Sequence, residues 1–168
     1  MALVEVSTFL PLSPATVWQM VQRPATLEQV SAPVLRFTPR KGALPAVWQA
    51  GEYQVGVKLY GLVPLDDQII GIEFPDHQGP GHALRDNGRA CARDGGPGGL
   101  IRRWDHLMLV MPEGNGTRYT DRVEVEAGAL TPLAARFARF LYTHRQKRWR
   151  ALAQAADTSA TKSSSARS

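Results

Sequence analysis

Extended segments broken by Gly and Pro make up most of the chain, and their hydrophobic and polar residues alternate as they do in strands. The first of them, residues 2–9, is rich in β-branched residues, which favour an extended backbone. Six later segments show the same features: 34–39, 52–60, 66–74, 83–92, 101–111 and 117–126. Because short turns join these later segments, we expect one antiparallel sheet.

Two short helices are predicted between the first and second strands. Ser13 followed by Pro14 is typical of a helix start, because Ser caps free backbone N–H groups and Pro has no N–H to satisfy. Residues 25–32 form the second helix, which Pro33 ends because the residue before a proline disfavours helical backbone.

The longest helical pattern covers residues 131–156 and begins with Thr131-Pro132, the same start signal. Steps of about 100° per residue place one group of residues on a single apolar stripe. The stripe consists of Leu133, Phe137, Phe140, Leu141, His144, Ala151 and Leu152. In a chain dominated by strands, such a helix is expected to lie across the sheet.

The last residues, 157–168, have no apolar content to bury, and we expect a disordered tail there. Residues 1–156 then form one domain, which is ordinary for a chain of 168 residues.

The net charge of +5 is unevenly distributed. Residues 1–130 hold 12 Lys and Arg against 14 Asp and Glu, whereas residues 131–168 hold 8 against 1. Four of these basic residues gather on one side of the long helix: Arg136, Arg139, Lys147 and Arg150. Such a face is either a solvated outer surface, which we prefer, or a peripheral contact with an anionic membrane. Nucleic acid is not expected, because no aromatic side chains stand between the basic ones to stack on bases.

The cysteine, the N-terminus, the histidines and the glycine run restrict the expected location and chemistry of the protein. Cys91 is the only cysteine, so no internal disulfide can form, and the N-terminus lacks a basic region followed by an apolar run. These features favour a cytoplasmic protein. The four histidines show no metal-ligand spacing, and the Gly95–Gly99 run lacks the residues of a phosphate loop. We therefore expect no metal and no cofactor.

Two segments carry a resemblance to a known family. The segment from Gly99 to His106 has the pattern Gly-x-x-x-x-Trp-x-His, and the segment from Gly116 to Val123 has the pattern Gly-Thr-x-x-x-Asp-x-Val. With the order of predicted elements, they resemble a bacterial ligand-binding branch of the START, polyketide-cyclase and birch-pollen-allergen (SRPBCC) superfamily. That branch often has a second histidine where this chain has Met108.

The resemblance covers residues 2–154 and implies an α+β helix-grip fold. A strongly bent seven-stranded antiparallel sheet, with two short helices, is expected to grip one long C-terminal helix over a cavity. Members of the superfamily mostly bind apolar small molecules there, and some cyclise or dehydrate polyketide chains.

The preferred hypothesis is a non-catalytic carrier or binding protein for a lipid, a quinone or a polyketide-like aromatic. Its expected ligand contacts are Trp104, Met108, Tyr119, Phe137, Phe140, Leu141, His144 and Arg148. Arg148 falls within the apolar stripe, where its guanidinium needs a carboxylate, a ligand anion or a path to solvent.

An enzyme of cyclase or dehydratase type is the alternative. If the turn at Asn115-Gly116 pairs the last two strands with both faces inward, His106 and Asp121 come close together. A histidine and a carboxylate are the minimum for proton transfer, with Tyr119 orienting the substrate. The same residues can equally be a polar pair that stabilises the fold, which we prefer. The oligomeric state stays open.

Overall fold

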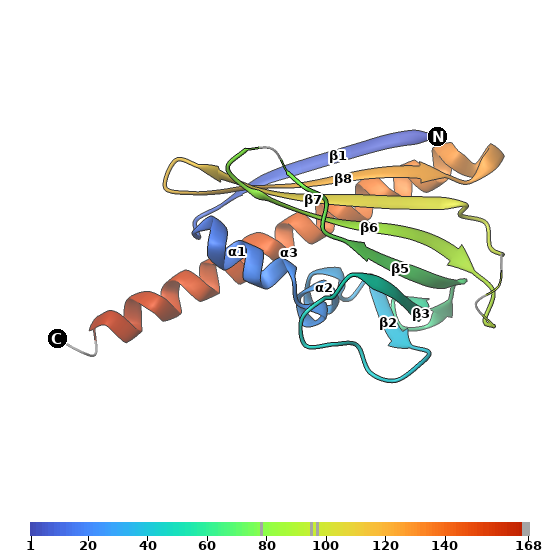
Figure 1. The fold of residues 1–168 in the computed structure, drawn as a ribbon, viewed down its shortest axis with the longest axis horizontal. Helices are drawn as coiled ribbons and strands as arrows, with labels where there is room; N and C mark the ends of the chain where they lie inside the picture. Colours follow the sequence, from blue (N-terminus) through green and yellow to red (C-terminus); the bar gives the residue numbers. More distant parts are fainter. Residues whose placement is uncertain (78, 95, 97, 166–168) are drawn as a thin grey trace.

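The computed structural model describes residues 1–77, 79–94, 96 and 98–165. A curled antiparallel sheet lies over one long helix and two short ones (Figure 1). The strands are β1 (Ala2–Leu10), β2 (Leu35–Pro39), β3 (Gly51–Leu59), β4 (Val63–Pro64), β5 (Asp67–Glu73), β6 (His82–Cys91), β7 (Arg103–Glu113) and β8 (Gly116–Glu126). The helices are α1 (Pro14–Val21), α2 (Pro24–Ser31), the short 3₁₀ turn η1 (Gly128–Leu130) and α3 (Thr131–Ser165).

The strands follow the order β1-β8-β7-β6-β5-β3-β2, and all neighbours are antiparallel. The seven predicted strands and the helix-grip fold are therefore confirmed, and β4 is a short addition that pairs with β3. Strand β1 lies beside β8, so the first and last strands of the chain are neighbours. The pairings of β5 with β6, β6 with β7 and β7 with β8 join consecutive strands, as expected from the turns.

Helices α1 and α2 also form where the sequence predicts them. The Ser13 hydroxyl accepts a hydrogen bond from the Thr16 backbone N–H at 3.2 Å, and Pro14 occupies the first turn of α1. The short helices bury Val17 and Val30 in the core, which lies between the concave side of the sheet and the helices.

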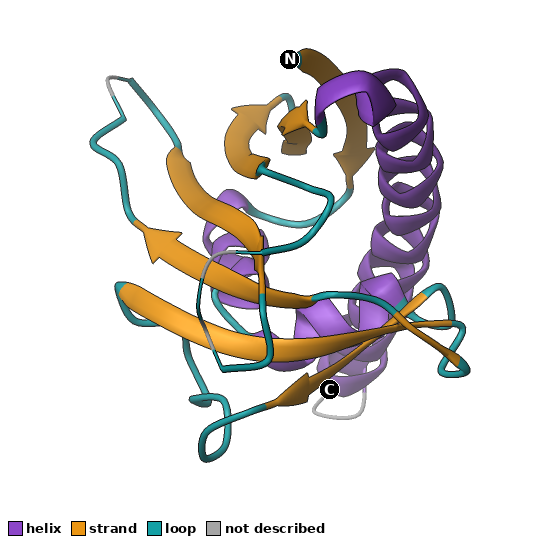
Figure 2. Cartoon of the chain, turned by 90° about the vertical axis from the view of Figure 1, so that its right-hand side faces the viewer, coloured by secondary structure: helices purple, strands orange, loops and turns teal. Residues whose placement is uncertain are grey.

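Helix α3 runs along the open side of the curled sheet (Figure 2). Its buried side differs from the predicted stripe. Leu133 is 65% exposed and Phe140 is 50% exposed, so neither belongs to the core. The residues that face inward are Ala138, Leu141, Tyr142, Arg145, Gln146, Trp149 and Ala153.

The physical reason for this correction is that the core-facing side of α3 includes a guanidinium and an amide. A stripe based on hydrophobicity leaves out the polar Arg145 and Gln146 and is therefore centred nearer to Phe140 and Leu133. Long polar side chains can occupy a buried helix face when their polar atoms reach partners inside the protein.

The two ends of α3 also differ from expectation. Turn η1 precedes the helix, and Thr131 Oγ1 accepts a hydrogen bond from the Ala127 N–H at 3.0 Å instead of capping the helix's own first N–H groups. The helix continues to Ser165, beyond its expected end at Ala156, because no Gly or Pro interrupts it there. Residues 166–168, the end of the segment for which disorder is expected, lie outside the described residues.

Candidate functional site

Two adjoining cavities interrupt the core between the sheet, α2 and α3. They share Leu27, Ile70, Asp86, His106 and Arg145. One cavity, which we call the Trp149 lobe, also contacts Val21, Val30, Trp48, Met108 and Trp149 and has a volume of about 30 Å³. The other, the Phe137 lobe, also contacts Phe37, Ile101, Trp104, Phe137 and Leu141 and has a volume of about 70 Å³. Together they have room for a few water-sized groups.

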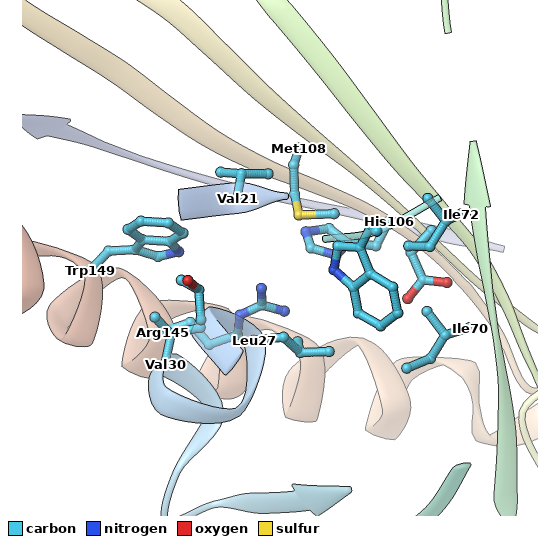
Figure 3. Close-up of a pocket in the computed structure, with 12 residues that line it drawn as sticks. Val21, Leu27, Val30, Ile70, Ile72, His106, Met108, Arg145 and Trp149 are labelled. Atoms are coloured by element: carbon cyan, nitrogen blue, oxygen red, sulfur yellow. The ribbon is translucent and has the colours of Figure 1, made fainter. Parts of the chain in front are cut away.

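Three polar side chains stand in the wall that the two lobes share. Asp86 comes from β6, His106 from β7 and Arg145 from α3. The Arg145 guanidinium lies between Trp149 and His106, inside the pocket (Figure 3). The cavity is thus mostly apolar with a few polar groups at one place, which is the usual composition of a small-molecule site.

His106 and Asp121 form the pair that the sequence predicted. The His106 Nε2 and Asp121 Oδ1 atoms are 2.8 Å apart, and both side chains are buried. Tyr119 donates its hydroxyl proton to the same oxygen at 2.8 Å, and Gln146 Nε2 donates to Asp121 Oδ2 at 2.7 Å. Asp121 therefore joins β7, β8 and α3 through three donors.

The pKa values of this pair move in the same direction for different reasons. Burial by itself raises the pKa of Asp121, but hydrogen bonds from His106 and Tyr119 and the nearby charge of Arg145 outweigh it, so the pKa is lowered. Burial lowers the pKa of His106 despite the opposing effect of Asp121. At neutral pH the carboxylate is ionised and the imidazole is neutral, with its Nε2–H donating to Asp121 and its Nδ1 carrying the lone pair.

Asp86 and Arg145 are the two charged groups that the sequence pattern did not single out. Asp86 Oδ1 accepts a hydrogen bond from the Gly71 N–H at 2.9 Å, and burial raises the pKa of Asp86 to about 7. Arg145 is 5% exposed, and among the described residues its guanidinium has no hydrogen bond or salt bridge. Its Cζ atom lies 5.0 Å from the centre of the Tyr142 ring.

Four of the predicted ligand contacts line the cavity. Trp104, Phe137 and Leu141 contact the Phe137 lobe, and Met108 contacts the Trp149 lobe. Tyr119 has no exposed surface and packs on Trp149, with 4.9 Å between ring centres, so it lies behind the cavity wall.

The three other predicted contacts lie elsewhere. Phe140 is on the outer side of α3, and Arg148 is exposed there, with its Nε donating to the Gln29 carbonyl at 3.4 Å. His144 Nε2 lies 2.8 Å from the Ala32 carbonyl oxygen at the end of α2. The orientation of α3 explains all three corrections, because the inward side passes through Tyr142 and Arg145 instead.

One signal for Arg145 was present in the sequence. It is spaced by four residues from Leu141 and from Trp149, which is the spacing of one helix face. Asp86 had no comparable signal, because the segment Arg85-Asp86-Asn87-Gly88 has the composition of a turn although it lies within β6.

The basic residues of α3 divide into two groups. Arg136, Arg139 and Lys147 line a shallow surface groove together with Phe140, Thr143 and His144. Arg150 instead donates a hydrogen bond to Thr8 Oγ1 on β1 at 3.0 Å. None of the helices, as far as they are described, combines the length and the apolar character needed to span a membrane.

Comparison with solved structures establishes the fold. TTHA0849 from Thermus thermophilus is 18% identical, with 92% of this chain and 99% of that chain covered and a TM-score of 0.61. Ms6760 from Mycobacterium smegmatis is 15% identical over 89% of each chain, with a TM-score of 0.66. A START superfamily protein from Mycobacterium smegmatis is 12% identical, with 92% and 98% covered and a TM-score of 0.63.

Curated proteins give no match to the sequence. A family model described as a domain of unknown function (DUF8410) matches residues 8–153, from the end of β1 to the last turns of α3 that contact the sheet. The chain therefore belongs to the DUF8410 family, and its fold is the helix-grip fold of the START-like proteins.

Proposed function

We propose that this protein binds a hydrophobic small molecule between the sheet and α3, as a carrier or binding protein. The observation that carries the proposal is the pair of adjoining lobes between the sheet, α2 and α3. Protein interiors are normally packed as densely as organic crystals, so a gap lined by Leu27, Ile70 and Phe137 is costly unless something fills it.

The size of the lobes restricts the ligand. With volumes of about 30 and about 70 Å³, the lobes hold only a few water-sized groups, so an aromatic ring, a lipid, a quinone or a polyketide-like aromatic requires outward movement of side chains. Leu27 and Phe137 are only partly buried, so they are the side chains whose displacement enlarges the cavity at the least cost.

Native mass spectrometry after incubation with a lipid extract tests this function. The wild type is expected to retain apolar molecules, and Leu27→Trp, which places a larger ring into both lobes, is expected to retain less. Phe140→Trp is the matched control, because residue 140 lies outside the cavity and should retain as much as the wild type. Failure of the wild type to retain any apolar molecule contradicts the proposal.

Catalysis of cyclase or dehydratase type is the second candidate. It is favoured by one observation, namely that a neutral His106, held by Asp121, contacts both lobes. Its Nδ1 lone pair is suited to accept a proton from a ligand. Under this candidate, His106→Ala abolishes turnover of a cyclisable substrate and leaves ligand retention largely unchanged, whereas unchanged turnover removes His106 from the mechanism.

Peripheral contact with an anionic membrane is a third candidate, and it is independent of the cavity. Arg136, Arg139 and Lys147 surround the half-exposed Phe140, and this combination suits an anionic lipid surface. Co-sedimentation with vesicles tests it. Binding to vesicles with anionic lipid but not to zwitterionic ones, and its loss in Arg136→Gln/Arg139→Gln, supports the contact; equal sedimentation with both vesicles contradicts it.

A further inference from the structure

We infer that the ligand carries a neutral carbonyl group, and that Arg145 and Trp149 donate hydrogen bonds to its oxygen in the Trp149 lobe. The apolar body of the ligand then lies in the Phe137 lobe. This inference rests on the proposed binding function and adds the chemical class of the ligand and its orientation.

Arg145 is the first observation. A guanidinium has five N–H donors and no acceptor, and a buried one normally has hydrogen-bond partners. Arg145 is 95% buried, yet its Nε has no partner, and no hydrogen bond from its other nitrogens is present among the described residues. Its contact with the ring of Tyr142 supplies no acceptor oxygen.

Trp149 is the second observation. Its indole Nε1–H is also buried and has no hydrogen-bond partner in the part of the chain that the structure describes, although Trp149 is among the largest fully buried side chains there. Trp149 lies four residues after Arg145, so both side chains emerge from the same face of α3, and both line the same lobe. Figure 3 shows them side by side in the pocket. The Arg145 guanidinium and the Trp149 indole N–H are thus two unpaired donors beside a small cavity, and a ligand with an acceptor atom in that cavity would satisfy them.

The negative charge already present near Arg145 favours a neutral acceptor over a charged one. Asp121 attracts Arg145 electrostatically, but both of its oxygens already accept hydrogen bonds, from His106, Tyr119 and Gln146. Asp121 thus balances the charge of Arg145 without satisfying its donors. A carboxylate ligand would add a further negative charge beside the ionised Asp121, whereas a carbonyl oxygen accepts the hydrogen bonds and adds no charge.

The two lobes then have separate roles. The Trp149 lobe, at about 30 Å³, has room for a group the size of a carbonyl, and the Phe137 lobe, at about 70 Å³, is lined by Phe37, Ile101, Trp104 and Phe137. The shared wall with His106 and Arg145 joins them, so one molecule can place its polar end in the first lobe and its apolar end in the second.

Three compact probes with a common benzene ring test this inference: acetophenone, ethylbenzene and benzoate. Their affinities for the full chain are measured by ligand-observed NMR competition. Acetophenone is expected to bind roughly tenfold or more tightly than ethylbenzene, because hydrogen bonds to a charged donor are lost without the carbonyl. Benzoate is expected to bind more weakly than acetophenone.

Variants of Arg145 and Trp149 test whether these residues cause the preference for acetophenone over ethylbenzene. Arg145→Met, which keeps an apolar chain of similar length, is expected to abolish the preference for acetophenone over ethylbenzene. Arg148→Met is the matched control, since Arg148 is an exposed arginine on the same helix, and it should preserve the preference. Trp149→Phe removes only the indole donor and is expected to reduce the preference severalfold, which provides a second variant if Arg145→Met does not fold.

Each contrary result has its own meaning. Equal affinities for acetophenone and ethylbenzene in the wild type overturn the carbonyl assignment and leave the proposed binding of apolar molecules intact. Tighter binding of benzoate than of acetophenone overturns the neutral character of the ligand. Failure of all three probes, together with failure to retain any molecule from a lipid extract, overturns the binding function itself.

Discussion

His106 on β7 and Asp121 on β8 are in hydrogen-bond contact at 2.8 Å although they do not face each other across the sheet. In the register of the two strands, His106 lies opposite Val123 and Asp121 lies opposite Met108. The contact is therefore a diagonal one, on the concave face where strand β8 and helix α3 both approach His106. Because Gln146 of α3 donates to the same carboxylate, Asp121 links the helix to the sheet.

Asp121→Asn is expected to destabilise the protein by about 2–4 kcal/mol. His106, Tyr119 and Gln146 donate hydrogen bonds to the two carboxylate oxygens, and the Asn side chain replaces one of these acceptors with an NH₂ donor. Urea unfolding followed by circular dichroism measures the change. Glu5→Gln is the control: it breaks the exposed ion pair with Arg122 and should cost less than about 1 kcal/mol. Similar losses in the two variants would show that Asp121 does not link the helix to the sheet.

Asp86→Asn is expected to change stability in a pH-dependent way. The pKa of Asp86 is raised from 3.8 in the unfolded chain to about 7 in the folded protein. Between these pH values the folded state therefore binds more protons than the unfolded state. The stability that the protonated Asp86 contributes to the wild type is present at low pH and is lost as the pH rises through about 7. Asn carries no charge and can still accept the Gly71 hydrogen bond. The variant should therefore match the wild type near pH 4 and exceed it near pH 8.

The upper limit of that gain is about 4 kcal/mol, from the rise of the pKa from 3.8 to about 7 at about 1.4 kcal/mol per unit. Thermal unfolding of both proteins over this pH range provides the measurement. A stability difference that does not vary with pH contradicts the assignment of a raised pKa to Asp86.

Phe137→Ala and Phe140→Ala are expected to differ. Phe137 is half-buried in the wall of the Phe137 lobe, so its loss should lower ligand affinity and reduce stability by about 1–3 kcal/mol. Phe140 is 50% exposed on the outer side of α3, so its loss should stay within about 1 kcal/mol and leave affinity unchanged. Denaturant unfolding and probe binding on the same preparations compare them; equal effects on both quantities would contradict the placement of the cavity.

Deletion of residues 157–168 is expected to leave the melting temperature almost unchanged. Ala153 is the last residue of α3 that is described as buried, and the end of the helix projects past the sheet in Figure 1. Deletion from Trp149 onward is the comparison, because it removes Trp149 and Ala153 from the core and should abolish cooperative unfolding. A loss of several degrees in the shorter deletion would mean that the end of α3 packs on the domain.

Local pattern in the sequence was enough to predict most of the fold. Seven strands and two short helices appear within about two residues of their expected positions, because alternation, Gly and Pro in the turns, and the Ser13 cap act within a few residues of chain. The proximity of His106 and Asp121 also followed from local information, since one hairpin turn sets the register between β7 and β8.

Only the tertiary structure decided which side of α3 faces the sheet. Hydrophobicity favoured Phe140 and Leu133, but the buried side carries Tyr142, Arg145, Gln146 and Trp149. Asp121 lies opposite this side and accepts the Gln146 amide, while its charge stabilises the nearby guanidinium of Arg145. A polar residue on a helix becomes a core residue when a partner from a distant strand meets it, and sequence periodicity carries no information about that partner. The polar wall of the cavity depends on the tertiary structure for the same reason. Its residues Asp86, His106 and Arg145 come from three elements that meet only in the folded chain.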